Sequence, residues 1–130
     1  MLAKQLKNAK NRTRAAKVQL MKLKSKASIL KRGQQIAQVE RVHFLVKSPD
    51  GGEGQVVVVS HLWSLGRVVD LAAELCTLKN SNNLPNTPKL RLLHDDESMI
   101  DENRLDGRVK ELISKGELCD GESLLLKFFD

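Results

Sequence analysis

With 130 residues and a formal net charge of +6, the chain is long enough for one compact domain and a short basic appendage. Its only two cysteines, Cys76 and Cys119, form no CxxC pair, which argues against a disulfide framework and against a zinc site built by this sequence alone. No apolar run approaches the roughly 20 residues that span a bilayer. We therefore expect a protein of a reducing compartment, cytoplasmic or nuclear, that has no membrane partner.

The positive charge is concentrated in the first 39 residues. This segment carries 11 Lys and Arg residues and no acid, whereas the rest of the chain carries the other 11 basic residues against all 16 acidic ones. Apolar or small side chains recur at steps of three and four from Leu2 to Leu30, which predicts a helix that ends before Gly33. Because Ala and Thr occupy the middle of this stripe, the helix should be strongest over Val18–Leu30.

A pair of strands is predicted next. Alternation in Val39–Lys47 places three apolar side chains on one face of the first strand, namely Val42, Phe44 and Val46. Ser48–Gly54 contains a proline and three glycines, which suits a hairpin connection longer than two residues. The second strand, Gln55–Ser60, has four consecutive valines, and periodicity does not tell which of them face the core.

The next predicted element is a helix that begins after Ser64. The Ser64 hydroxyl is placed to accept a hydrogen bond from a backbone amide of the first turn. Apolar residues at helical spacing form the expected buried stripe of this helix, which consists of Leu65, Val68, Ala72 and Leu75. The polar segment Asn80–Pro88 ends the helix, and Lys89–His94 forms the third strand.

The remaining predicted elements are an acidic loop (Asp95–Asn103), a short helix (Val109–Lys115) and a last strand (Ser123–Phe128). Leu124, Leu126 and Phe128 should point inward from that strand. The whole order resembles a ubiquitin-like β-grasp, an α+β fold in which a mixed sheet packs on one main helix. A right-handed crossover allows the last strand to pair in parallel with the first.

We accordingly expect three regions. These are a basic helical extension or linker (1–32), a hinge (33–38) and a ubiquitin-like domain (39–130). Such a fold favours protein recognition over catalysis.

The stretch His61–Asn83, HLWSLGRVVDLAAELCTLKNSNN, is followed by KLRL, and its most specific part is Trp63–Asn83. It resembles the C-terminal ubiquitin-like domain of the AN1-type zinc-finger proteins, in the branch linked to stress responses at the proteasome. The basic run Ala15–Ala27 is similar to the segment that precedes that domain. The resemblance therefore covers about residues 15–130.

This resemblance implies a non-enzymatic adaptor that binds the valosin-containing AAA ATPase, with the proteasome as a further partner. It also implies a location in the cytoplasm, the nucleus or stress granules. The zinc fingers of the family need Cys and His clusters that this chain lacks, so zinc binding and proteasome docking through them are not carried over. No cofactor and no small-molecule substrate are expected.

A docking surface is predicted on the sheet face that points away from the main helix, because this face is the main docking surface of ubiquitin. If Leu92 and Leu124 point toward the helix, their neighbours point away from it and form a small apolar patch with a basic rim. The candidate residues are Arg41, Lys47, Arg91, Leu93, Leu125 and Lys127. The alternative is that these leucines are ordinary exposed side chains.

The basic helix offers a function of another class, namely nucleic-acid binding through phosphate contacts. Its candidate residues are Arg12, Arg14, Lys17, Lys22, Lys24 and Lys26. A solvated linker and a contact with an acidic protein are the alternatives, and we favour the linker because no aromatic side chain lies between the charges.

Other chemistry-bearing residues are expected to be structural. Trp63 is suited to a hydrophobic staple at the helix entry, with a partner-facing aromatic as the alternative. The three histidines and two cysteines match no metal-ligand spacing, and no nucleophile is paired with a base. The acidic cluster of the Asp95–Asn103 loop lacks the calcium-loop pattern, so we expect a solvated loop or a contact with a basic partner.

Overall fold

The computed structural model describes residues 2–50, 53–78, 89–100 and 106–129, with the side chains of the first helix from Arg12 onward. Its elements in chain order are α1 (Leu2–Ile29), the 3-10 turn η1 (Gln38–Glu40), β1 (Arg41–Lys47), β2 (Gln55–Ser60), α2 (Leu65–Leu75), β3 (Lys89–His94), α3 (Val109–Ser114) and β4 (Ser123–Phe129). This order agrees with the predicted one. The predicted loop Asn80–Pro88 and the part of the acidic loop that holds Asp101 and Glu102 lie outside the described residues.

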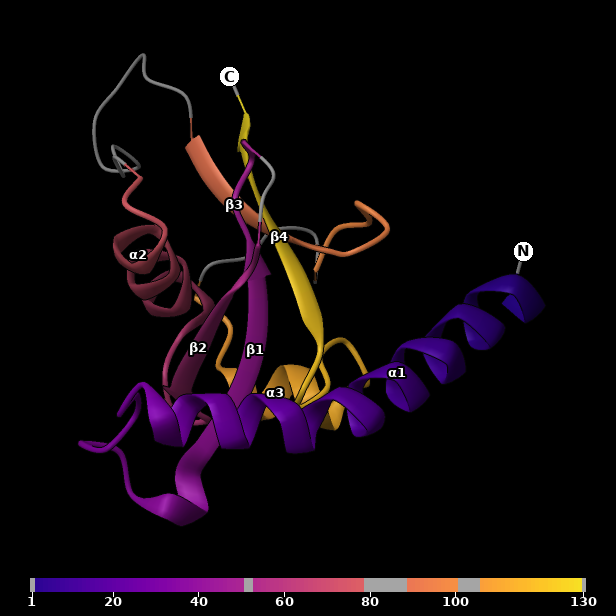
Figure 1. Cartoon of the computed structure of the whole chain (residues 1–130). Helices are drawn as coiled ribbons and strands as arrows, with labels where there is room; N and C mark the ends of the chain where they lie inside the picture. The colour runs from indigo at the N-terminus through magenta and orange to yellow at the C-terminus, as the bar shows by residue number, and fades with distance from the viewer. Residues whose placement is uncertain (1, 51–52, 79–88, 101–105, 130) are drawn as a thin grey trace.

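The four described strands form one mixed sheet in the order β2–β1–β4–β3 (Figure 1). β1 pairs antiparallel with β2 and parallel with β4, and β4 pairs antiparallel with β3. The last strand pairs in parallel with the first, as the sequence predicted. The topology confirms the expected α+β fold of the β-grasp type.

The inner face of the sheet is the face that carries Val42, Phe44 and Val46 of β1. These side chains are buried in one cluster with apolar residues of α2, as strand alternation predicted. Ser64 caps α2, because its hydroxyl accepts a hydrogen bond from the backbone amide of Arg67 at 3.3 Å. The main core of the domain therefore lies between the sheet and α2, with α3 closing one end.

Phe128 departs from the prediction. Its side chain is 41% exposed, although it lies on the same face as the buried Leu124 and Leu126. β1 pairs with β4 only as far as Leu125, so Phe128 extends beyond the β1–β4 ladder and has only β3 as its neighbour in the sheet. The expectation that Phe128 points into the core is therefore wrong.

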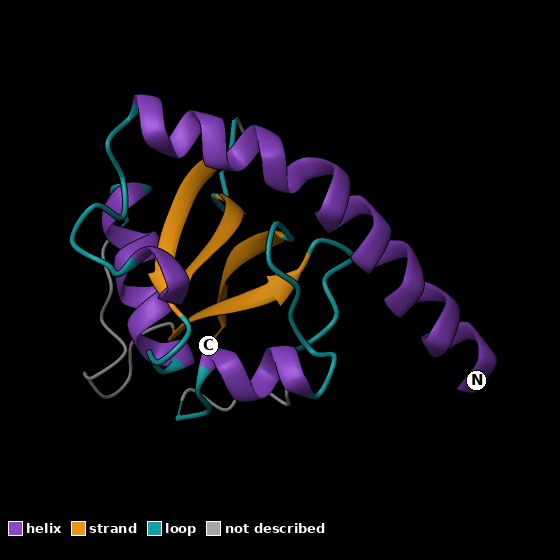
Figure 2. Cartoon of the chain, turned by 90° about the horizontal axis from the view of Figure 1, so that it is seen from below, coloured by secondary structure: helices purple, strands orange, loops and turns teal. Residues whose placement is uncertain are grey.

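The outer face of the sheet is covered in part by α1, on the side opposite to α2 and α3 (Figure 2). Leu23 and Ala27 of α1 are buried against Val56 and Val58 of β2, together with Ile36 from the connection to β1. Val57 and Val59 of β2 face α2 instead. All four valines of β2 are thus buried, which explains why periodicity could not assign them.

Small residues allow α1 to approach the domain closely. A Cβ atom on Gly121, whose φ is +94°, would lie 2.9 Å from Leu20 Cβ and closer still to the carbonyl oxygen of Ala16. Gln19 Nε2 donates hydrogen bonds to the carbonyl oxygen of Gly121 at 2.8 Å and to Ser123 Oγ at 2.9 Å. The stripe of Ala and Leu in the basic segment therefore packs on the sheet of its own chain.

The connection after α1 is also packed. Ile36 is 6% exposed, and a Cβ atom on Gly33 would lie 2.7 Å from Val58 Cβ. The division of the chain at residues 33–38 stays a prediction, but in this structure the connection contributes to the second apolar cluster. None of the helices in the described ranges is long and apolar enough to cross a membrane.

Candidate protein-interaction surface

The half of the outer face formed by β3 and β4 carries most of the predicted docking residues. Arg91 pairs directly with Lys127, and Leu93 pairs with Leu125, in the β3–β4 ladder. Lys47 of β1 is the partner of Leu125 in the parallel ladder. The structure therefore brings five of the six predicted residues onto one area, which we call the β3–β4 surface and which consists of Lys47, Arg91, Leu93, Leu125 and Lys127.

Leu93 corrects the prediction, because its side chain is only 2% exposed. Leu93 lies between Leu125 of β4 and the turn after β3. This turn folds back so that the backbone of Met99 pairs with that of Leu93 in a single antiparallel β-bridge. Leu125 is half-buried, Arg91 is half-buried and Lys127 is exposed. The exposed pair of leucines that the sequence suggested is therefore absent, and a partner would meet Leu125 surrounded by cations.

The turn after β3 also places carboxylates at the edge of this surface. Lys47 Nζ lies 3.1 Å from Asp95 Oδ1, and Lys127 Nζ lies 2.9 Å from Glu97 Oε1. Both pairs are solvent-exposed ion pairs, which contribute little to stability. The predicted basic rim is thus partly neutralised, and Arg91 forms no ion pair with the described side chains.

Asp96 lies in the same turn and is held by Ser98. Its Oδ1 accepts hydrogen bonds from the Ser98 hydroxyl at 2.6 Å and from the Ser98 backbone amide at 3.0 Å. These bonds stabilise the ionised carboxylate and hold the pKa of Asp96 below its ordinary value. The acidic loop is therefore an ordered turn in this region, with its carboxylates directed to partners of the same chain.

Arg41 is not part of the β3–β4 surface. It lies at the opposite end of β1 from Lys47, where its Nε donates a hydrogen bond to the carbonyl oxygen of Ile36 at 2.9 Å. It lines a pocket with Lys24 and Arg32. The prediction that Arg41 borders the docking patch is therefore wrong, because the length of β1 separates the two places.

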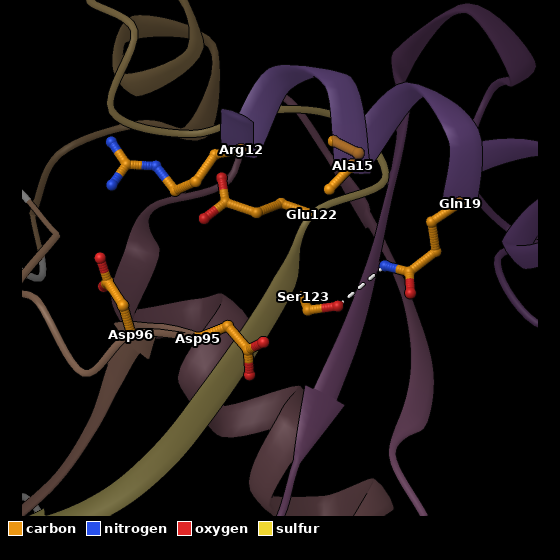
Figure 3. Close-up of a pocket in the computed structure, with 8 residues that line it drawn as sticks. Arg12, Ala15, Gln19, Asp95, Asp96, Glu122 and Ser123 are labelled. Atoms are coloured by element: carbon orange, nitrogen blue, oxygen red, sulfur yellow. Dashed lines mark hydrogen bonds between the residues drawn. The ribbon is translucent and has the colours of Figure 1, made fainter. Parts of the chain in front are cut away.

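A cleft of about 340 Å³ separates α1 from the turn after β3 and the start of β4 (Figure 3). The cleft is lined by Arg12 and Gln19 of α1, by Asp96 of the turn, and by Glu122, which directly precedes β4. Arg12 is half-buried here, and its charge adds to the lowering of the Asp96 pKa. Arg12 therefore belongs to an intramolecular contact, unlike the other predicted cations of α1.

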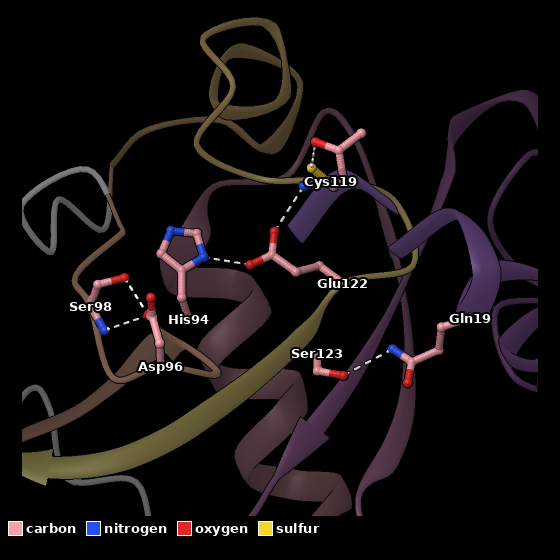
Figure 4. Close-up of polar contacts among 8 residues, drawn as sticks. Gln19, His94, Asp96, Ser98, Cys119, Glu122 and Ser123 are labelled. Carbon is pink, nitrogen blue, oxygen red and sulfur yellow. Dashed lines mark hydrogen bonds and ion pairs between the residues drawn. The ribbon is translucent and has the colours of Figure 1, made fainter. Parts of the chain in front are cut away.

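Beneath this cleft lies a buried pair that sequence reasoning missed (Figure 4). His94 Nδ1, at the end of β3, pairs with Glu122 Oε2, and the two side chains are 2% and 4% exposed. Glu122 Oε1 also accepts a hydrogen bond from the Cys119 backbone amide at 3.0 Å. No local signal could reveal the pair, because its members lie 28 positions apart. It joins β3 to β4 below the docked helix.

The other basic candidates of α1 face solvent. Their side chains are exposed, and none of them forms an ion pair within the described residues; they are Arg14, Lys17, Lys22, Lys24 and Lys26. Four of them do not line the pocket that contains Arg41, whereas Lys24 does. We call these five exposed cations the basic stripe of α1.

Trp63 and the cysteines have structural surroundings. Trp63 packs against both apolar clusters just before α2, and the guanidinium of Arg67 lies 4.0 Å from its ring centroid. Burial raises the pKa of the Cys76 thiol, which makes it a poor nucleophile. Within the described part of the chain, no three His, Cys, Asp or Glu side chains are grouped as metal ligands would be.

Comparison with known proteins identifies the domain around the β3–β4 surface. The family model described as the ZFAND1-like ubiquitin-like domain matches residues 58–130. AN1-type zinc finger protein 1 of Homo sapiens is 43% identical over 94 residues, which cover 71% of this chain and 34% of that protein. The protein of the same name from Mus musculus is 36% identical over 130 residues, which cover 95% of this chain and 46% of that protein. The chain thus spans between about a third and a half of the length of these relatives.

Proposed function

Since this chain belongs to the family of the ZFAND1-like ubiquitin-like domain, we propose that it is an adaptor that binds the valosin-containing AAA ATPase in proteasome-linked protein quality control. Its ubiquitin-like domain is a non-enzymatic module, and the resemblance of its motif to the stress-linked branch of the family supports this partner. A role in the cytoplasm, the nucleus or stress granules during stress is part of the same proposal.

The observation that carries the proposal is the partial exposure of the β3–β4 half of the outer face at Arg91, Leu125 and Lys127. α1 covers the outer face over β1 and β2, where Val56 and Val58 are buried. On the other half, Lys127 is exposed and Arg91 and Leu125 are half-buried. Arginine is enriched in protein-binding hot spots, and Arg91 lies here beside the partly exposed apolar side chain of Leu125. A partner would therefore dock on β3 and β4, with the acidic turn at the margin of the contact.

The proposal is tested by reversing the charge of the two cations that face each other across β3 and β4. We expect the Arg91→Glu plus Lys127→Glu variant of the full chain to bind the purified ATPase at least about tenfold more weakly. Lys22→Glu plus Lys26→Glu is the matched control, because it makes the same charge change on the exposed side of α1. Equal binding by the wild type and the Arg91/Lys127 variant would contradict the proposal.

The exposed basic stripe of α1 favours nucleic-acid binding as a second candidate function. Phosphate contacts of this kind depend steeply on salt and little on sequence. The discriminating variants are again the two charge reversals: loss of binding to single-stranded RNA in the Lys22/Lys26 variant alone would place this function on α1. Deleting residues 1–32 is less informative, since it would expose Val56 and Val58 and disturb the sheet.

A further inference from the structure

A second pocket, of about 350 Å³, lies where the C-terminal part of α1, the connection after it and the start of β1 meet. Four side chains that carry or can carry positive charge line this pocket, and they are Lys24, Arg32, Arg41 and His43. Asp120 is the only carboxylate among the described residues that line it. These four side chains come from consecutive segments of the chain, and the turn between α1 and β1 brings them to one place.

The two arginines are held in place by backbone carbonyl groups. Arg32 Nη1 donates a hydrogen bond to the carbonyl oxygen of Val56 at 2.7 Å, and Arg41 Nε donates one to that of Ile36 at 2.9 Å. Each guanidinium has five N–H donors, so one such bond orients the group and leaves donors for an oxyanion. Neither arginine forms an ion pair within the described residues. Their charges are therefore positioned but not neutralised by a carboxylate.

His43, which lines the same pocket, supplies an independent observation. Its side chain is 9% exposed, and its buried Nδ1 atom has no hydrogen-bond partner. A buried polar atom without a partner costs free energy, which a ligand could recover. Asp120 Oδ1 lies 3.5 Å from this nitrogen but accepts its hydrogen bond from the backbone amide of His43 at 2.7 Å. The single carboxylate is thus already engaged by the backbone of His43.

We propose that this pocket binds a phosphoryl group, either as free inorganic phosphate or as the phosphate monoester of a phosphorylated side chain. Arginine forks match the oxygen geometry of phosphate, and a lysine adds a point charge. Two held arginines and the nearby Lys24, against one carboxylate that already accepts a backbone hydrogen bond, favour a doubly charged oxyanion over a single carboxylate. Because Lys24 belongs to α1 and Arg41 to β1, a bound phosphoryl group also fastens the helix to the sheet.

The test is an NMR titration of the full chain with inorganic phosphate and, separately, with N-acetyl-phosphoserine amide, at constant ionic strength. We expect saturable shifts of the backbone amides of Gln38 and His43. Equal affinity for the two probes would identify free phosphate as the ligand, and tighter binding of the phosphoserine derivative would identify a phosphorylated side chain. Shifts that rise linearly without saturation for both probes would overturn the proposal.

Two substitutions and one control locate the site. Lys24→Gln and Arg41→Gln should each weaken binding by about tenfold. Lys26→Gln makes the same charge change on α1 but does not line the pocket, and it should change the affinity less than about twofold. Lys24 is exposed, so its substitution leaves the fold intact even if Arg41→Gln disturbs the contact with Ile36. Equal weakening by Lys24→Gln and Lys26→Gln would show a general charge effect and overturn the assignment.

Discussion

Gly121 touches Ala16 of α1 so closely that a side chain at position 121 would overlap the helix backbone. This contact holds α1 close to the residues that lead into β4. It also explains the small residues of the basic segment, since the backbones can approach each other only where side chains are short. The docked helix is thus part of the surface that a partner meets.

The first prediction concerns this contact. Gly121→Ala should destabilise the chain by about 1 kcal/mol from its positive φ and by about 1–3 kcal/mol more from the clash with α1. Gly116→Ala is the matched control, because Gly116 also has a positive φ of +79° but would bring its Cβ within 4 Å of nothing. Urea unfolding measures both values. Equal losses of unfolding free energy would mean that α1 is not held against Gly121.

The second prediction concerns Leu93. Because this side chain is buried, Leu93→Asp should lower the free energy of unfolding by more than about 3 kcal/mol, whereas Lys127→Gln should change it by less than about 0.5 kcal/mol. Thermal and urea unfolding followed by circular dichroism provide the comparison. A mild effect of Leu93→Asp would show that the leucine is accessible and would restore it as a docking residue.

The third prediction concerns the buried pair of His94 and Glu122. Glu122→Gln keeps an acceptor for the Cys119 amide but removes the charge that faces His94, so it should cost about 1–3 kcal/mol of stability. His94→Gln should cost a similar amount. The double variant should lose less unfolding free energy than the sum of the losses in the two single variants. The difference, which is the coupling energy of the pair, should exceed about 0.5 kcal/mol. Additive losses would show that the pair is not a unit.

The fourth prediction concerns pH. The hydrogen bonds from Ser98 lower the pKa of Asp96, so the carboxylate favours the folded state above its ordinary pKa, and this contribution is lost as the pH falls through the lowered value. Ser98→Ala should move the pKa of Asp96 up toward its ordinary range, as measured by carbon-detected NMR titration. Ser25→Ala, an exposed serine on α1, should leave it unchanged. An unchanged pKa in Ser98→Ala would exclude Ser98 as the cause.

Much of the fold could be predicted because its signals are local. Strand alternation assigned Val42, Phe44 and Val46 to the core, and the hydroxyl of Ser64 marked the start of α2. The placement of α1 could not be predicted. Alanine side chains bury little apolar area, and the glycine that allows Ala16 to pack closely lies more than 100 positions away in the sequence.

The candidate surface was only partly predictable for the same reason. Alternation placed Leu93 and Leu125 together on the outer face, and the ladder confirms their pairing. It could not show that the turn after β3 folds back toward Leu93, nor that Asp95 and Glu97 pair with the lysines of the rim. These contacts depend on the path of a loop, which periodicity does not encode.

The central claim is that the β3–β4 surface binds the AAA ATPase. Its most direct test is a calorimetric titration of the full chain into the purified ATPase at low salt and at physiological salt, about 0.15 M. The account predicts binding at both salt concentrations, because the contact has the apolar Leu125 at its centre, and it predicts no loss in the Lys22/Lys26 variant. Binding that disappears at physiological salt, or with the Lys22/Lys26 variant, would assign the contact to the basic stripe of α1 and contradict the account.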